Sequence, residues 1–181
     1  MVALVAPLVA CASPAVLVDE ADLDGVQSAE QNTEHAIAPG WTWCSAISPN
    51  VNMRAPYTGS RFELEDGTSV GATILARRAE GLTATAMLQD VVDAADQCAL
   101  EARPDDLGTA IEPLDGLQQD TRGWRTVDPE GRWGEYVVEP LDEWRLLAYG
   151  FVTRADRAPV DLDDLRDLAV AGAERLPASE G

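Results

Sequence analysis

The chain has 181 residues, a length that suits one domain of ordinary size. Its 13 basic residues are outnumbered by 32 acidic residues, and the formal net charge of -19 argues against binding to the phosphate backbone of nucleic acids. Hydrophobic residues make up 46% of the chain, which predicts a packed core. The single histidine, His35, excludes most histidine-dependent catalysis and histidine-rich metal sites.

The N-terminus carries an uncharged apolar run over residues 2–10, which has the length of the apolar region of a secretory signal peptide. The run ends in Leu8-Val9-Ala10-Cys11, which resembles a bacterial lipobox, where cleavage before the cysteine exposes a thiol for lipid attachment. A positively charged start is missing, so we expect residues 1–11 to be a truncated signal peptide with lipidation at Cys11. The alternative is cleavage at Ala10-Cys11-Ala12, an Ala-x-Ala site, which would make the protein simply secreted.

Three cysteines are present, and an odd number in an exported protein requires an explanation for the unpaired one. Lipidation of Cys11 would leave Cys44 and Cys98 to form a disulfide, which persists only in an oxidising compartment. Two separate buried thiols are the alternative.

Residues 12–40 are poor in large apolar side chains and rich in Asp, Glu, Gln, Ser and Ala. We interpret them as an acidic, disordered tether between the membrane and the folded domain. A single α+β domain of the binding or sensor type is then expected over residues 41–178.

The sequence of the first half of this domain predicts a β-hairpin followed by a helix. In the hairpin, over residues 60–78, Phe62 and Leu64 alternate with charged residues, and Asp66-Gly67 indicates a two-residue turn. A helix is predicted over residues 83–103, and Cys98 lies on its apolar face.

The second half predicts further strands and a final helix. Strands over residues 124–127 and 132–139 flank a turn at Asp128-Pro129-Glu130-Gly131. Residues 143–153 are apolar on both faces, which predicts a central strand, and Asp161 should cap a helix over residues 161–176.

The predicted order is β-β-α-β-β-β-α, with an extra strand around residues 109–113. It indicates an α+β fold, an antiparallel β-sheet with two helices packed on one face.

The sequence offers little evidence of catalysis. Gly67-Thr68-Ser69-Val70-Gly71 matches G-x-S-x-G, but it opens a predicted strand and His35 lies upstream of it, which argues against a serine hydrolase. C-x-x-C, H-E-x-x-H and glycine-rich phosphate-binding patterns are absent from the sequence. We therefore predict no catalytic residues, no metal and no cofactor.

The five tryptophans are the remaining signal. Their ordinary role is to bury a large apolar area, and the alternative is a cleft for an apolar or carbohydrate ligand. Trp124 and Trp133 flank the proline–glycine turn and are the pair expected to be exposed. Arg54 and Tyr57 lie in a polar loop that could line the same cleft, so these four residues form a candidate ligand-binding site.

Several features together resemble small extracytoplasmic lipoproteins of actinobacteria: Leu8-Val9-Ala10-Cys11, the acidic spacer, Trp43-Cys44 and Ala94-Ala95-Asp96-Gln97-Cys98. More distantly, residues 41–176 resemble the extracytoplasmic sensor domains of mycobacterial serine/threonine kinases. That resemblance implies an antiparallel sheet, helices and disulfides around a ligand-binding cleft. The chain departs from it in having one candidate disulfide where those domains have two, and in having no kinase.

Together these patterns favour a non-enzymatic lipoprotein domain that binds a small ligand or a protein partner in the cell envelope. It would be anchored at the extracytoplasmic face of the cell membrane through lipid on Cys11. One alternative is a pocketless interaction or structural lipoprotein acting through its acidic face. Another is a carboxylate-based hydrolase of envelope glycans.

Overall fold

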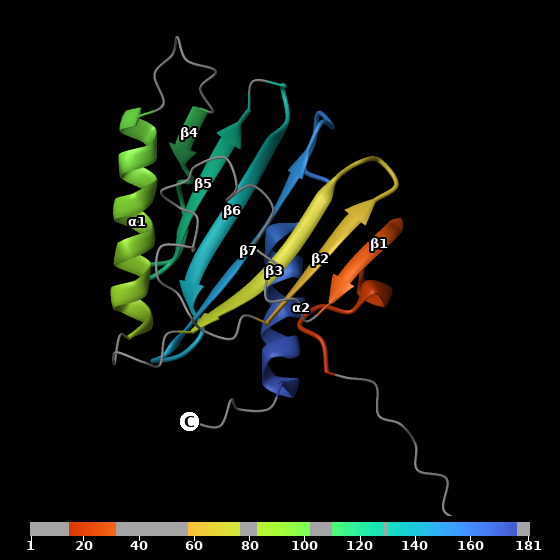
Figure 1. Ribbon diagram of the computed structural model, residues 1–181, viewed down its shortest axis with the longest axis horizontal. Helices are drawn as coiled ribbons and strands as arrows, with labels where there is room; N and C mark the ends of the chain where they lie inside the picture. The colour runs from red at the N-terminus through yellow and green to blue at the C-terminus, as the bar shows by residue number, and fades with distance from the viewer. Residues whose placement is uncertain (1–14, 32–57, 77–82, 102–109, 129, 177–181) are drawn as a thin grey trace, which may run out of the picture.

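The computed structural model describes residues 15–31, 58–76, 83–101, 110–128 and 130–176 (Figure 1). In these residues one seven-stranded antiparallel sheet has the order β1-β2-β3-β7-β6-β5-β4. The strands are β1 (Val26–Gln31), β2 (Thr58–Leu64), β3 (Ser69–Ala76), β4 (Ala110–Pro113), β5 (Arg122–Val127), β6 (Trp133–Pro140) and β7 (Arg145–Thr153). The helices are η1 (Glu20–Asp22, a 3₁₀-helix), α1 (Ala84–Glu101) and α2 (Leu162–Arg175). The predicted α+β class is confirmed.

Strand β7 lies at the centre of the sheet, between β3 and β6, as its two apolar faces predicted. The predicted hairpin, the short strand before β5 and both helices are also present. Asp161 caps α2, because its side chain accepts a hydrogen bond from the backbone N–H of Asp163 at 2.8 Å. The elements with a clear hydrophobic period therefore form where the sequence places them.

The two helices lie over opposite faces of the sheet, whereas one covered face was predicted. Along β7, Leu146 and Ala148 belong to the buried cluster of α1, while Leu147, Tyr149 and Phe151 belong to the cluster of α2. Successive side chains of a strand point to opposite faces, so the two clusters are separated by the sheet. In Figure 1, α2 lies behind the sheet and α1 stands beside β4 and β5.

Residues 15–31 form part of the fold, so the prediction of a disordered tether over residues 12–40 is wrong for this stretch. Strand β1 pairs with β2 at one edge of the sheet, and a register shift between Val26 and Ser28 interrupts its alternation. Only small or partly buried apolar side chains face inward from β1. An edge strand of this kind has almost no hydrophobic period, which explains why its sequence resembled a solvated spacer.

The segment before η1 packs tightly against α2. Leu17 and Val18 have 0% exposure, and a Cβ atom at Gly172 of α2 would overlap the carbonyl oxygen of Leu17. The Ser60 hydroxyl of β2 accepts a hydrogen bond from the Val18 N–H at 3.0 Å, and Gln31 donates to the Val18 carbonyl at 3.0 Å. The folded domain therefore begins no later than Leu17 in the chain.

The β2–β3 and β5–β6 hairpins close with three-residue loops that end in a left-handed glycine. In the first, the Leu64 N–H donates to the Thr68 carbonyl at 2.8 Å, and Gly67 has φ 79°. The loop is thus one residue longer than the predicted two-residue turn, since a type I turn followed by glycine needs three residues. In the second hairpin, the Asp128 N–H donates to the backbone carbonyl of Arg132 at 2.8 Å, and Gly131 has a φ of 76°.

Replacing Gly172 tests the packing of the N-terminal segment. Gly172→Ala should lower the free energy of unfolding by about 1–3 kcal/mol, because the added methyl group has no space beside Leu17. Urea denaturation followed by circular dichroism measures this change. Ala171→Ser, at the exposed neighbouring position, should change it by less than about 0.5 kcal/mol. Equal stability of the two variants would contradict the packing.

The second hairpin should be sensitive to acid through Asp128. Burial alone would raise the pKa of this carboxyl group, but hydrogen bonds and the charge of Arg132 lower its pKa below the ordinary value. A lowered native pKa stabilises the fold above the unfolded pKa, and this contribution is lost as the pH falls through the native pKa. Asp128→Asn should therefore cost up to about 1 kcal/mol at neutral pH, and the cost should shrink below about pH 4.

Denaturation of wild type and Asp128→Asn at several pH values checks this expectation. Asp156→Asn is the control, because it removes an exposed carboxylate that has no hydrogen-bond partner among the described residues. A difference in stability between wild type and Asp128→Asn that does not change with pH would contradict the lowered pKa of Asp128.

Candidate functional site

An open cleft with a volume of about 340 Å³ lies between α1 and the loop that joins β4 to β5. Helix α1 supplies Val92 and Asp96, which are one turn apart and therefore share a face. Strand β5 supplies Trp124, which is 8% exposed. The loop supplies the opposite wall and most of the polar lining.

The loop is held by its backbone and by a close approach to β5. The Leu114 N–H donates to the Gly123 carbonyl at 2.8 Å, and Gly116 has φ 79°, a left-handed conformation that favours glycine. A Cβ atom at Gly123 would lie 2.9 Å from both Leu114 and Leu117, so these leucines pack directly onto the glycine. The missing side chain at Gly123 thus allows the loop to fold over the sheet edge.

The charged side chains of the cleft differ in whether they have hydrogen-bond partners. The Arg122 guanidinium donates to the backbone carbonyls of Gln119 at 2.9 Å and Thr121 at 2.8 Å. Asp96 and Asp115 are exposed, and neither has a hydrogen-bond or ion-pair partner among the described residues. The cleft therefore presents two exposed carboxylates, without partners among the described residues, beside an arginine whose Nη1 group is bonded to the loop backbone.

An ion pair with a buried carboxylate and a half-buried arginine braces the end of the loop against α2. The Glu139 carboxylate, 6% exposed, accepts hydrogen bonds from Arg166 Nε at 2.5 Å and from the Thr121 hydroxyl at 3.3 Å. The hydrogen bond that Arg166 donates to Glu139 raises the pKa of Arg166. Burial first, and then the Glu139 charge, raises the pKa of Tyr149, which stays a neutral phenol at physiological pH.

The predicted tryptophan pair is separated by the sheet. Trp133 pairs with Val127 of β5, three residues from Trp124, and an odd separation along a strand reverses the face. The Trp133 indole donates to the Ala155 carbonyl at 2.6 Å, its ring meets Phe151 edge-on, and Arg125 lies over it. Trp124 alone lines the cleft.

The prediction that Trp124 and Trp133 form an exposed pair is therefore wrong. Closeness to a hairpin turn says nothing about which face a side chain occupies. Among the described tryptophans the exposed one is Trp144, at 43%, in the connection between β6 and β7.

The side chains of the remaining predicted site residues lie outside the part of the chain that the structure describes. Cys11, Cys44, Arg54 and Tyr57 lie outside the described residues, and Cys98 lies within α1 with its side chain outside them. Lipidation, the disulfide and the roles of Arg54 and Tyr57 stay predictions.

Sequence reasoning missed the loop between β4 and β5 as the wall of a cleft. The available signal was Asp115-Gly116, a turn sequence between apolar residues. It indicates a reversal of the chain, but not a hollow beside it.

Across the described ranges, no group of three or more His, Cys, Asp or Glu is placed to hold a metal ion. Neither helix, as far as the structure describes them, is long and apolar enough to cross a bilayer. No protein-family model matches the chain, and no curated protein matches it.

Breaking the buried ion pair should destabilise the fold. Arg166→Met leaves the Glu139 carboxylate buried without its cation, which should cost about 1–3 kcal/mol in unfolding free energy. Adding Glu139→Gln removes the buried charge and should recover part of that loss. Arg175→Met, at the exposed end of α2, is the control. Equal urea midpoints for Arg166→Met and Arg175→Met would refute the bracing role.

Proposed function

We propose that this protein is a non-enzymatic cell-envelope lipoprotein whose cleft beside Trp124 binds a small ligand or a protein partner outside the cytoplasmic membrane. Lipid on Cys11 would anchor it to the extracytoplasmic face of the membrane. The lipobox-like sequence and the odd number of cysteines support this location.

The cleft itself is the observation that carries the proposal. Its volume of about 340 Å³ falls at the lower end of the range of roughly 300–1,000 Å³ for small-molecule sites. Trp124, Leu114 and Leu117 are apolar residues of the lining, and the side-chain amides of the loop with the carboxylates of Asp96 and Asp115 could orient a ligand. Such a mixture is typical of a recognition site.

The lining favours binding over catalysis. Thr121 is a hydroxyl-bearing residue of the described lining, and its side chain donates to Glu139. Asp96 and Asp115 both line the cleft, as a glycan hydrolase would require, but both are exposed to solvent. The general acid of a glycosidase is instead a carboxyl group held in an apolar environment.

The proposal is tested on the protein purified gently from its own cells. Intact mass spectrometry should show loss of residues 1–10, a lipid mass on Cys11, and two hydrogens fewer than the same form would have with Cys44 and Cys98 as free thiols. Native mass spectrometry should show an additional, noncovalently retained mass. An unprocessed chain with three free thiols would refute the envelope location.

Two variants locate the retained molecule. Leu117→Trp fills the cleft, whereas Val127→Trp adds the same bulk at an exposed position of β5 outside the lining. The retained mass should disappear in Leu117→Trp and persist in Val127→Trp. Persistence in both variants, or no retained mass in wild type, would refute binding in this cleft.

A further inference from the structure

We infer that the cleft selects a small organic cation that has an apolar portion, of the alkylamine or arylamine class. This inference rests on the proposed function of the cleft as a binding site. It concerns the chemistry that the lining residues can recognise.

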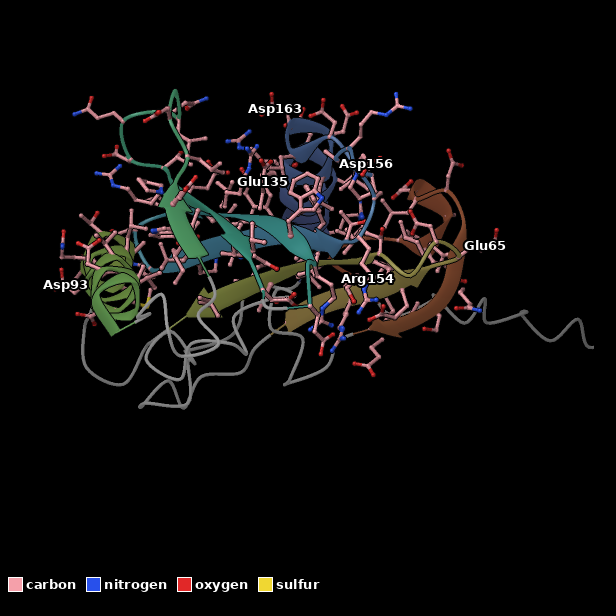
Figure 2. All side chains as sticks on the ribbon, turned by 90° about the horizontal axis from the view of Figure 1, so that it is seen from above. Glu65, Asp93, Glu135, Arg154, Asp156 and Asp163 are labelled. Atoms are coloured by element: carbon pink, nitrogen blue, oxygen red, sulfur yellow. The ribbon has the colours of Figure 1, made fainter. Side chains whose placement is uncertain are left out.

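The preference for a cation starts from the carboxylates of Asp96 and Asp115. Some described acidic side chains have arginine partners, as in Asp128 with Arg132 and Asp142 with Arg145, whereas others, such as Asp156, are exposed without one among the described residues (Figure 2). Asp96 and Asp115 have none among the described residues, although both border the same hollow. They approach it from different elements, α1 and the β4–β5 loop, so a cation between them could contact both walls.

The basic residue of the cleft does not cancel this preference. Arg122 is the one basic residue in the described lining, and its guanidinium already donates to two backbone carbonyls of the loop. The formal charge of the described lining is negative by one, from two aspartates and one arginine. The described lining therefore keeps a net negative charge, which favours a cation over an anion.

The apolar wall sets the second requirement. Val92, Leu114, Leu117 and Trp124 are the large apolar residues of the described lining, and Leu117 is 37% exposed. A bare metal ion or ammonium ion would leave that surface in water, whereas an amine with a hydrocarbon body would bury it. The lining thus favours an amphipathic cation over a simple one.

The charge of the whole chain acts in the same direction. A formal net charge of -19 raises the local concentration of cations at the surface and repels anions. This field is not specific to the cleft, so a test must separate the two lining carboxylates from the general acidity. Strand β1 offers that control, because it forms the edge of the sheet opposite to β4.

Calorimetric titration of the purified chain with three probes of similar shape provides the test. The probes are phenylethylamine (cationic), phenylethanol (neutral) and phenylacetate (anionic). Phenylethylamine should bind at least about tenfold more tightly than either of the others, equivalent to about 1.4 kcal/mol. Its affinity should fall as salt is raised, because exposed charges are screened.

Matched charge variants locate the effect. Asp96→Asn with Asp115→Asn should weaken phenylethylamine binding about three- to tenfold, as expected for exposed ion pairs, and leave phenylethanol binding unchanged. Asp24→Asn with Glu30→Gln removes the same charge at the β1 edge, where both residues are exposed. This control pair should weaken binding less than about twofold.

The other outcomes overturn the inference. Equal binding of phenylethanol, tighter binding of phenylacetate, or equal losses in the two double variants would show that the cleft does not select a cation. In each of these cases binding in the cleft itself, tested by Leu117→Trp, would stand. Failure of all three probes would also refute the amine class, and the native retained mass would then decide the proposed function separately.

Discussion

Strand β7 has to be covered on both faces, because buried side chains project from it in both directions. Helix α1 covers Leu146 and Ala148, and α2 covers Leu147 and Phe151. Neither helix could leave the sheet without exposing half of the central strand to water. Leu17 and Val18 are buried in the same cluster as α2, so this N-terminal segment and the last helix stabilise the same face of the sheet.

The face beneath α1 depends on a tyrosine that lies over two glycines. A Cβ atom at Gly150 would lie 2.8 Å from the Tyr136 ring, and one at Gly134 would lie 2.9 Å from its hydroxyl. The ring therefore occupies space that ordinary side chains would fill. Gly123 plays the same part for the loop beside the cleft. In both places a missing side chain on the sheet determines what can pack above it.

Much of the fold could be predicted because its strands and helices carry strong local patterns, as at Phe62 and Leu64 or at the Asp161 cap. Strand β1 could not, since an edge strand with a register shift at Val26 buries little and shows no clear period. The distribution of the helices over two faces also depends on tertiary pairing. The cleft was missed for a related reason: Trp124 was recognised, but the wall formed by the β4–β5 loop follows from a contact with Gly123.

The tight packing of Leu17 against α2 also limits how far the domain could lie from a lipid-modified Cys11. Five residues lie between these positions, and six steps of an extended chain at about 3.3–3.6 Å each span roughly 20 Å in total. A lipoprotein mounted this closely has little reach above the bilayer. The end of the domain near Gly172 would stay beside the headgroups, whereas the cleft lies toward the β4 edge of the sheet, away from the anchored β1 edge.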